Sequence, residues 1–406
     1  MDLSHKNNKG VQISLPAVII AGVAILVGGF IIGMSSPTWF PVQASTQAEQ
    51  GVGLFRVLLT LGGVVFLLVQ GLLLYSIVRF RARPGDTSDG PNIHGNVTLE
   101  IIWTAIPAIV VFGLVIYSWQ VWTTTRAEQS NETVIEVTAQ RFAWTFDYTD
   151  PLNRLVDQPE TSQQFSSSVL HTYVNQPILL KIRAVDVNHA FWVPTMQIKQ
   201  DALVGRETEV RFTPIRAGRY RVVCAELCGG GHGGMFTYVV VHQTEEDLYS
   251  QFVDIQVNNI LNPPTDPVAI GQNLLANAVY PCSGCHRLDA LSWTGATGPN
   301  LNGIGNRAAE RAVASGDPSA EYYLARSIRH PNGYTVPGFA ANVMPQFGDS
   351  EAIPVEIDGA SYLYMTDNDL TGIVAYLCTQ TESGDVADST CGDEEAIRAA
   401  VAAQAE

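Results

Sequence analysis

Three long apolar runs near the N-terminus constrain the fold of this 406-residue chain more than any other feature. They cover residues 15–34, 57–78 and 101–122, and none contains a charged side chain. An α-helix needs about 20 apolar residues to cross the hydrocarbon core of a bilayer. The second and third runs therefore predict two transmembrane helices in a multidomain membrane protein, and the first run is a candidate for a third.

The first apolar run has two interpretations. Its length and its basic flank, which contains Lys6 and Lys9, fit a signal-anchor helix that stays in the membrane. The sequence "VQAS" at residues 42–45 resembles a signal-peptidase site, which would make residues 1–50 a cleaved signal peptide. Because the apolar region of a signal peptide is normally shorter, the pattern slightly favours the retained helix.

A basic loop after the second run sets the orientation. Arg79, Arg81 and Arg83 lie together in "RFRARPG", and short loops rich in arginine stay in the cytoplasm. Residues 51–125 are then a transmembrane hairpin, and the chain beyond about Arg126 lies on the outer face of a bacterial-type cell membrane. Pro107 would kink the second helix of the hairpin, which neighbouring helices can tolerate.

Glu100 is the one ionisable residue at the cytoplasmic end of the third run, in "LEIIWT". A carboxylate in the first turn of a helix interacts favourably with the helix dipole. Ionisable groups at membrane helices also mark ion paths, so Glu100 is a candidate for proton uptake. The pattern alone favours the helix-capping role.

Residues 126–255 change to short runs rich in β-branched and aromatic residues. Such strands separated by turns predict a β-sandwich or barrel. The polar segment 150–168 is expected to be a loop or insertion. The predicted strands are "TVIEVTAQ", "RFAWTFDYT", "PILLKIRAV", "TEVRFTP", "GRYRVVC" and "MFTYVVVH".

The sequence "CAELCGGGHGGM" gathers four soft ligands, Cys224, Cys228, His232 and Met235, between the last two of these strands. Thiolate, thioether and imidazole together select copper or zinc. With His189, a zinc site of two cysteines and two histidines is possible by count. Methionine is a poor zinc ligand, and a mononuclear blue-copper site needs a single cysteine. The loop therefore favours two coppers that share the thiolates over zinc or a disulfide.

With "NHAFWVP" and "DALVGR" upstream, this loop resembles the copper-A site of cytochrome c oxidase subunit II. The resemblance covers about residues 51–252 and implies a cupredoxin domain after the transmembrane hairpin. It implies that Cys224 and Cys228 bridge two coppers, with terminal ligands His189 and His232, a weak ligand in Met235, and the backbone carbonyl of Glu226. The carboxylate of Glu226 would also reach a magnesium ion shared with subunit I.

The same resemblance implies roles for two other residues. Trp144, in "RFAWTFDY", would accept the incoming electron, although composition alone makes it a core aromatic residue. Glu100, in its "E-x-x-W-T" context, would be the proton-uptake carboxylate. Quinol-oxidising relatives have lost the copper ligands, so their retention implies a cytochrome as the electron donor.

A second cluster, "CSGCH", follows the proline-rich segment "LNPPTDP" in the predicted linker at residues 256–267. Two cysteines followed by histidine are the attachment signature of c-type haem. Cys282 and Cys285 would form the thioether bonds, and His286 would be the proximal iron ligand. A thioredoxin-like or zinc site would not need this histidine.

Residues 268–380 further resemble a small class I cytochrome c, which implies an all-α domain. "GPNLNGIGNR" matches the loop beside the proximal histidine, and "NVMPQF" makes Met344 the distal ligand. Methionine ligation raises the haem potential. The alternatives are Met365, which directly precedes a predicted helix N-cap, and His330 in a turn-like segment.

The C-terminal region is acidic. Residues 260–406 contain 6 arginines, no lysine and 18 acidic residues, a balance of −12 within a net charge of −16. This charge argues against nucleic-acid binding and suits a basic protein partner. Outside the cytoplasm, Cys378 and Cys391 are expected to form a disulfide that contributes ~3 kcal/mol and ties down the acidic tail at residues 381–406.

These features together predict subunit II of a haem-copper terminal oxidase that carries its own cytochrome c domain. Electrons from cytochrome c would pass through copper-A to the haem of subunit I, where oxygen is reduced to water with proton translocation. The alternative is the electron-accepting subunit of a copper-A nitric oxide reductase. Nitrous oxide reduction would need a histidine-rich domain, and the chain has 8 histidines. The haem signature and Glu100 argue against a copper-delivery protein.

Overall fold

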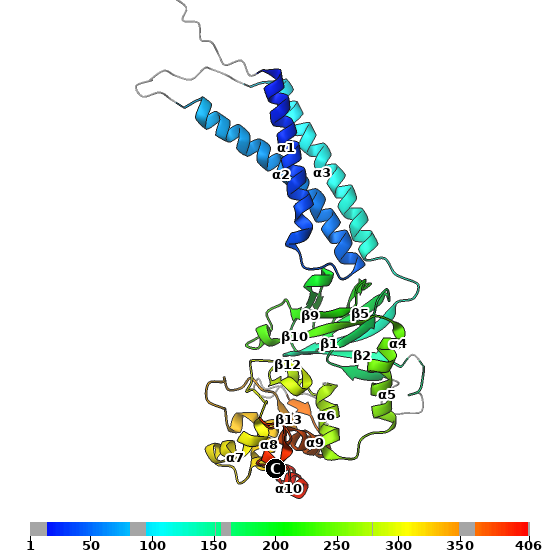
Figure 1. Cartoon of the computed structure of the whole chain (residues 1–406), viewed down its shortest axis with the longest axis vertical. Coiled ribbons are helices and arrows are strands. Elements are labelled where there is room, and N and C mark those ends of the chain that lie inside the picture. The colour runs from blue at the N-terminus through cyan, green and yellow to red at the C-terminus, as the bar shows by residue number, and fades with distance from the viewer. Residues whose placement is uncertain are drawn as a thin grey trace, which may run out of the picture. The chain divides into compact units, whose positions relative to one another are not determined.

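The computed structural model describes residues 14–81, 95–150, 152–155, 164–277, 279–348 and 362–404. Lys6 and Lys9, the basic flank of the first apolar run, and Arg83, from the basic loop that predicts the orientation, lie outside these ranges. The chain divides into two compact units, Met1–Ala127 and Glu128–Glu406 (Figure 1). Each is considered by itself.

The first unit consists of three long helices, α1 (Leu15–Ser35), α2 (Thr46–Arg79) and α3 (Val97–Thr125). All three are long and apolar enough to cross a membrane. Helices α2 and α3 begin at polar caps, because Ser45 accepts a hydrogen bond from the Ala48 amide and Asn96 accepts one from Leu99. Helix α1 packs closely on α2, since a Cβ added to Gly33 would overlap the side chain of Thr60.

The second unit begins with a β-sandwich of two five-stranded sheets. The strand orders are β3-β2-β1-β5-β8 and β4-β10-β9-β6-β7. Along β1 and β10 buried residues alternate with less buried ones, as expected when one face of each sheet packs in the core. The strands are β1 (Thr133–Gln140), β2 (Ala143–Thr149), β3 (Gln164–Ser167), β4 (Leu170–Tyr173), β5 (Ile178–Ala184), β6 (His189–Val193), β7 (Ile198–Ala202), β8 (Thr208–Phe212), β9 (Gly218–Cys224) and β10 (Phe236–His242).

Strand β3 corrects the expectation that residues 150–168 form only a loop or insertion. It is short and polar, and it pairs antiparallel with β2 at the edge of its sheet. Polar side chains contribute to this pairing, since the Ser166 hydroxyl donates to Asp147. Hydrophobic alternation could not reveal such a strand.

The register of the second sheet brings the predicted ligands together. Strand β6 pairs antiparallel with β9, so that Phe191 lies opposite Cys224. Strand β9 pairs with β10, and the Cys224 amide donates to the Met235 carbonyl at 3.0 Å, which closes the loop between them. The ligands on this loop and His189 at the start of β6 therefore meet at one end of the sheet.

The region after the sandwich is mainly helical. Helices α6 and α9 cross closely, because a Cβ on Gly271 would overlap the backbone of Gly372. Two short strand pairs, β11–β12 and β13–β14, correct the expectation of an all-α domain. The elements are α4 (Glu245–Leu248), α5 (Asp254–Leu261), α6 (Pro267–Ala276), β11 (Arg287–Leu288), β12 (Trp293–Thr294), α7 (Ile304–Ser315), α8 (Ala320–Arg329), β13 (Gln346–Gly348), β14 (Tyr362–Tyr364), α9 (Asp367–Cys378) and α10 (Glu394–Ala402).

The predicted linker at residues 256–267 is extended only in part. Helix α5 runs to Leu261, and Asp266 caps α6 by accepting a hydrogen bond from the Ala269 amide. The segment between the two helices is therefore limited to residues 262–266, where the prolines of "LNPPTDP" disfavour helix continuation.

His171 on β4 holds the segment after β10 against the sandwich. Its ring stacks on Phe252 with centroids 3.9 Å apart, and its Nδ1 lies 3.0 Å from Nε2 of His242. Burial, aided by the nearby His242 and Arg219, lowers the pKa of His171 to about 3. The neutral imidazole is thus the form that fits this position.

We expect this histidine to make the fold acid-sensitive. A folded-state pKa below the unfolded value means that the unfolded chain binds the proton first, so stability is complete above pH 6.5 and falls towards pH 3. Between pH 6.5 and pH 5 the loss should be about 2 kcal/mol. Chemical unfolding of the purified chain should show this loss of stability, and His171→Phe should make the loss smaller. The exposed His330, changed to Gln, is the control and should leave the pH dependence as it is in the wild type.

Candidate metal centre and haem-attachment site

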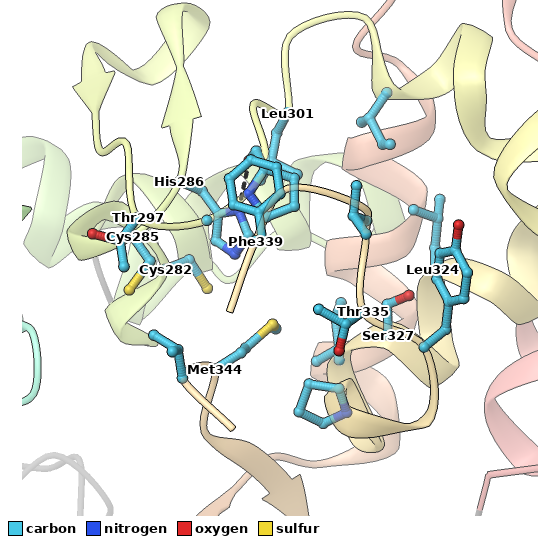
Figure 2. A pocket seen from close by; sticks show the side chains of 18 of the residues that line it. Cys282, Cys285, His286, Thr297, Leu301, Leu324, Ser327, Thr335, Phe339 and Met344 are labelled. Atoms are coloured by element: carbon cyan, nitrogen blue, oxygen red, sulfur yellow. Dashed lines mark hydrogen bonds between the residues drawn. The ribbon is translucent and has the colours of Figure 1, made fainter. Parts of the chain in front are cut away.

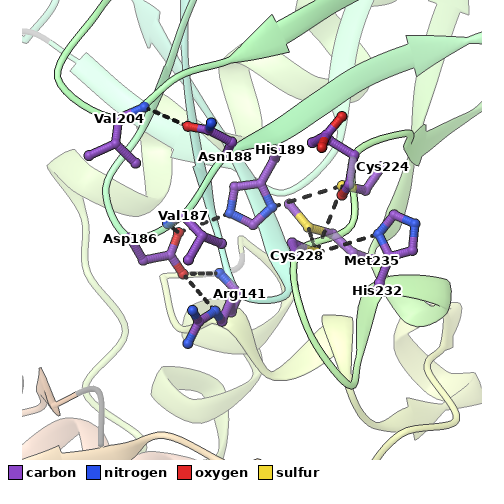
Figure 3. A network of polar contacts seen from close by, with 11 residues as sticks. Arg141, Asp186, Val187, Asn188, His189, Val204, Cys224, Cys228, His232 and Met235 are labelled. Carbon is purple, nitrogen blue, oxygen red and sulfur yellow. Dashed lines mark hydrogen bonds and ion pairs between the residues drawn. The ribbon is translucent and has the colours of Figure 1, made fainter. Parts of the chain in front are cut away.

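The predicted metal ligands converge at one end of the β-sandwich (Figure 3). Cys224 ends β9, and Cys228, His232 and Met235 come from the loop that follows it. His189 comes from the start of β6. The ligand atoms of His189, Cys224 and Cys228 all lie within 4.8 Å of one another, and all three residues are buried.

The two sulfur atoms lie at the centre of this group, 3.9 Å apart. Each sulfur has its own imidazole neighbour, since Nδ1 of His189 lies 3.9 Å from Cys224 Sγ and Nδ1 of His232 lies 3.5 Å from Cys228 Sγ. Met235 Sδ lies 3.8 Å from Cys228 Sγ, and the Glu226 carbonyl oxygen lies 3.1 Å from Cys224 Sγ. This paired arrangement suits two soft metal ions that share two thiolates.

Asp186 orients His189 and was missed by the sequence analysis. Nε2 of His189 donates to Asp186 Oδ1 at 2.9 Å, which leaves Nδ1 directed at the Cys224 sulfur. The same carboxylate accepts hydrogen bonds from the Arg141 and Val187 amides, each at 2.7 Å. A carboxylate that fixes the second nitrogen of a ligating histidine is a common support of metal sites. Its position three residues before His189 was the available signal.

The thiols and His189 are electrostatically coupled. A hydrogen bond from Cys228 lowers the pKa of Cys224 to about 3, and the same contact raises the pKa of Cys228. Burial is the largest single influence and opposes charge on His189, but the hydrogen bonds and charges of Asp186 and Cys224 together raise the pKa of this imidazole. One thiol of the pair is thus held as a thiolate, the form that binds metals.

The second cluster lines a pocket of the C-terminal region (Figure 2). Cys282, Cys285, His286 and Met344 surround about 1110 Å³ of space, part of it open to solvent. Most of the other lining residues are apolar, among them Leu301, Leu324 and Phe339. Pockets of this character hold large, mainly apolar ligands.

His286 is held with one ring nitrogen free. Its Nδ1 donates to the Pro299 carbonyl at 2.8 Å, so Nε2 is left to bind a metal. Burial lowers the pKa of His286, and burial raises the pKa of Cys282 to about 12 and of Cys285 to about 11. In the absence of a bound group, burial therefore favours the protonated thiols and the neutral imidazole.

The candidate distal ligands occupy different places. Met344 lines the pocket across from His286 (Figure 2). Met365 is fully buried in the core, and its side chain does not line the pocket. His330 is exposed, and its Nδ1 lies 3.2 Å from the Gln346 amide nitrogen.

Arg329 holds the backbone next to Met344 and was not anticipated. Its side chain is almost fully buried, and Nη1 donates to the carbonyls of Phe347, Gly348 and Met365 at 2.7–3.0 Å. Its Nη2 pairs with Asp367 at 2.7 Å. Arg329 thus ties β13, which begins two residues after Met344, to the start of α9.

Three other predicted residues have clear positions. Trp144 is only 2% exposed and packs edge-on to Phe191 and His189. Glu100 lies exposed in the first turn of α3 and accepts a hydrogen bond from the Asn96 amide at 3.3 Å, as the capping role requires. Cys378 and Cys391 are joined in a disulfide with Cα atoms 5.5 Å apart.

A β-sandwich with two buried thiols between two imidazoles defines the class of cupredoxin-like electron carriers. In this chain it follows three helices that can span a membrane. Residues 32–121 match the family "Cytochrome C oxidase subunit II, transmembrane domain", and residues 133–243 match "Cytochrome C oxidase subunit II, periplasmic domain".

Known proteins are similar to this chain over half of its length or more. Cytochrome c oxidase subunit 2 of Synechocystis sp. is 33% identical over 56% of this chain and 79% of its own length. The corresponding protein of Alkalihalophilus pseudofirmus is 28% identical over 77% of this chain and 82% of its own. The crystal structure of the periplasmic domain of a Bradyrhizobium japonicum cytochrome oxidase subunit II is 26% identical, with a TM-score of 0.26 over 32% of this chain and 98% of that one.

The chain belongs to the cytochrome c oxidase subunit II family. It is a membrane-embedded subunit of a haem-copper oxidase, where it transfers electrons, and its copper-A-type domain is extracytoplasmic. The relatives compared are named as oxidase subunits, which favours oxygen reduction over the nitric oxide alternative.

Proposed function

We propose that the cluster around the two thiols binds the binuclear copper-A centre. When bound, the copper pair would supply one-electron redox chemistry, and the residues of this cluster would hold it on the electron path to the haem of subunit I. The observation that carries this assignment is the 3.9 Å separation of the two sulfurs with a separate imidazole beside each. The assigned ligands are His189, Cys224, Glu226 (carbonyl), Cys228, His232 and Met235.

The ligand set favours copper over zinc. Met235 is 1% exposed with its sulfur 3.8 Å from Cys228 Sγ, so it belongs to the cluster rather than to the surrounding core. Strands β6, β9 and β10 hold the ligands from one rigid sheet. Ligands fixed in this way move little when the charge of the centre changes, which suits electron transfer.

We further propose that residues 268–380 form a cytochrome c domain. Cys282 and Cys285 would bind haem covalently, with His286 and Met344 as axial ligands. The hydrogen bond of His286 to Pro299 and the pocket lined by Cys282, Cys285, His286 and Met344 support this assignment. The Alkalihalophilus match covers 77% of the chain, whereas residues 1–243 make up three fifths of it, so part of this region is shared with that relative.

Two carboxylates are proposed to act with other subunits. Glu226 is exposed in the metal-binding loop, so its carboxylate is free for a magnesium ion shared with subunit I. Glu100 is exposed at the start of α3, where it could take up protons. Trp144, whose ring packs edge-on to His189, is proposed to be the point of electron entry. The donor itself would be a basic, soluble cytochrome c.

Oxygen uptake by the purified complex tests the function. With reduced cytochrome c as donor, we expect oxygen consumption that depends on the copper and haem of this chain. Nitric oxide reduction without oxygen uptake would support the alternative reductase.

A further inference from the structure

Phe142 lies between the metal-binding loop (residues 225–235, between β9 and β10) and the haem-attachment turn (residues 281–286, which contain "CSGCH"). A Cβ added to Gly284, inside "CSGCH", would overlap the carbonyl oxygen of Phe142. A Cβ added to Gly231, inside the metal-binding loop, would overlap the Phe142 ring. Both positions therefore accept only glycine without movement of the neighbouring backbone or ring.

A second contact joins the same two segments. A Cβ on Gly234 would lie 2.8 Å from Thr297 Oγ1 and 3.2 Å from the Gly284 carbonyl oxygen. Gly234 lies between the ligands His232 and Met235, and Gly284 lies between Cys282 and Cys285. The two domains thus touch through the residues that separate their ligands.

We infer that Phe142 and these glycines form an interface that seats the haem-attachment turn on the metal-binding loop. The inference rests on the proposed function, because it gives the contact a role only if both centres are present. One electron would leave the haem iron and one would arrive at the copper pair across this contact, and no atom or proton would move. Residues 281–286 of the same chain therefore cover this face of the copper domain.

This interface also restricts where an electron donor can bind. Phe142 is 6% exposed, so a soluble cytochrome c cannot reach it while the turn is seated. A donor must then deliver its electron to the C-terminal domain. Glycine at positions 234 and 284 is required by the close approach of two folded domains, and glycine at position 231 is required by the packing of the Phe142 ring within the copper domain. Metal or haem ligation itself does not need these glycines.

Gly284→Ala tests the interface in the purified oxidase, with Gly348→Ala as the control, since a Cβ on Gly348 meets open space. Hydrogen exchange of residues 141–143 and 284–286 reports the contact whether or not the centres are loaded. We expect about tenfold faster exchange in Gly284→Ala and wild-type exchange in the control. The enhancement of copper spin relaxation by the ferric haem should fall in parallel, while the copper and haem spectra stay unchanged.

A pair of compensating substitutions distinguishes loss of the interface from a local folding defect. Gly234→Ala should raise the hydrogen-exchange rate less than Gly284→Ala does. Adding Thr297→Ala to Gly234→Ala should return the exchange rate towards the wild-type value, because the Thr297 hydroxyl, the closest clashing atom, is removed. Wild-type exchange and relaxation in Gly284→Ala would overturn the interface. If copper or haem is absent from the wild-type protein, the proposed function fails, and the exchange data still decide the interface.

Discussion

Replacing Cys228 with serine is expected to abolish the two-copper centre and to reduce oxygen uptake by about 100-fold or more. The Cys228 sulfur contacts three other assigned ligands, with Cys224 Sγ, His232 Nδ1 and Met235 Sδ all within 3.9 Å. A serine hydroxyl is a hard, protonated group that does not bridge soft metals. Loss of a ligand should cost at least as much as loss of its supporting hydrogen bond, which typically costs 10–100-fold.

The measurement is the EPR spectrum together with copper analysis. The wild type should show the multi-line hyperfine pattern of one electron shared by two copper nuclei, and Cys228→Ser should show a single-copper pattern or none. Gly230→Ala is the control in the same loop, because its Cβ meets open space. A wild-type protein that binds zinc, or a Cys228→Ser variant that keeps the shared-electron pattern, would rule out the assignment.

The proposed metal ligands could be predicted from the sequence because their chemistry is rare and local. Cys224, Cys228, His232 and Met235 lie within twelve residues, and the structure brings them to the same point. Asp186 was missed because an aspartate in a loop has many ordinary roles, and only the fold shows it against His189. Arg329 was missed for the same reason, since its partners are 18–38 residues away in sequence.

The helices and strands also differ in how far their own sequence predicts them. The three apolar runs predicted α1, α2 and α3 because a lipid-spanning helix carries its signal in its own sequence. Strand β3 forms only by pairing with β2, and its polar side chains give no hydrophobic alternation that a sequence pattern could detect. The burial of Phe142 and Trp144 depends on packing between distant segments, so no local pattern could distinguish an exposed electron acceptor from a core aromatic residue.

Met344→Ala is expected to change the haem spectrum from low spin to high spin, or to that of a new sixth ligand, and to lower the reduction potential. Met344 lines the pocket opposite His286, and methionine ligation raises the haem potential. Optical and EPR spectra of the purified chain at equal haem content provide the measurement.

Met365→Leu is the matched control, because Met365 packs in the core and a leucine of similar volume should preserve both spin state and potential. Arg329→Gln should give an intermediate result. It removes the cation that binds three carbonyls beside β13, so the methionine should stay attached in only part of the population, and the domain should lose about 3 kcal/mol of stability. If Met365→Leu changes the spin state while Met344→Ala does not, the two methionines exchange roles and the pocket geometry no longer explains the ligation.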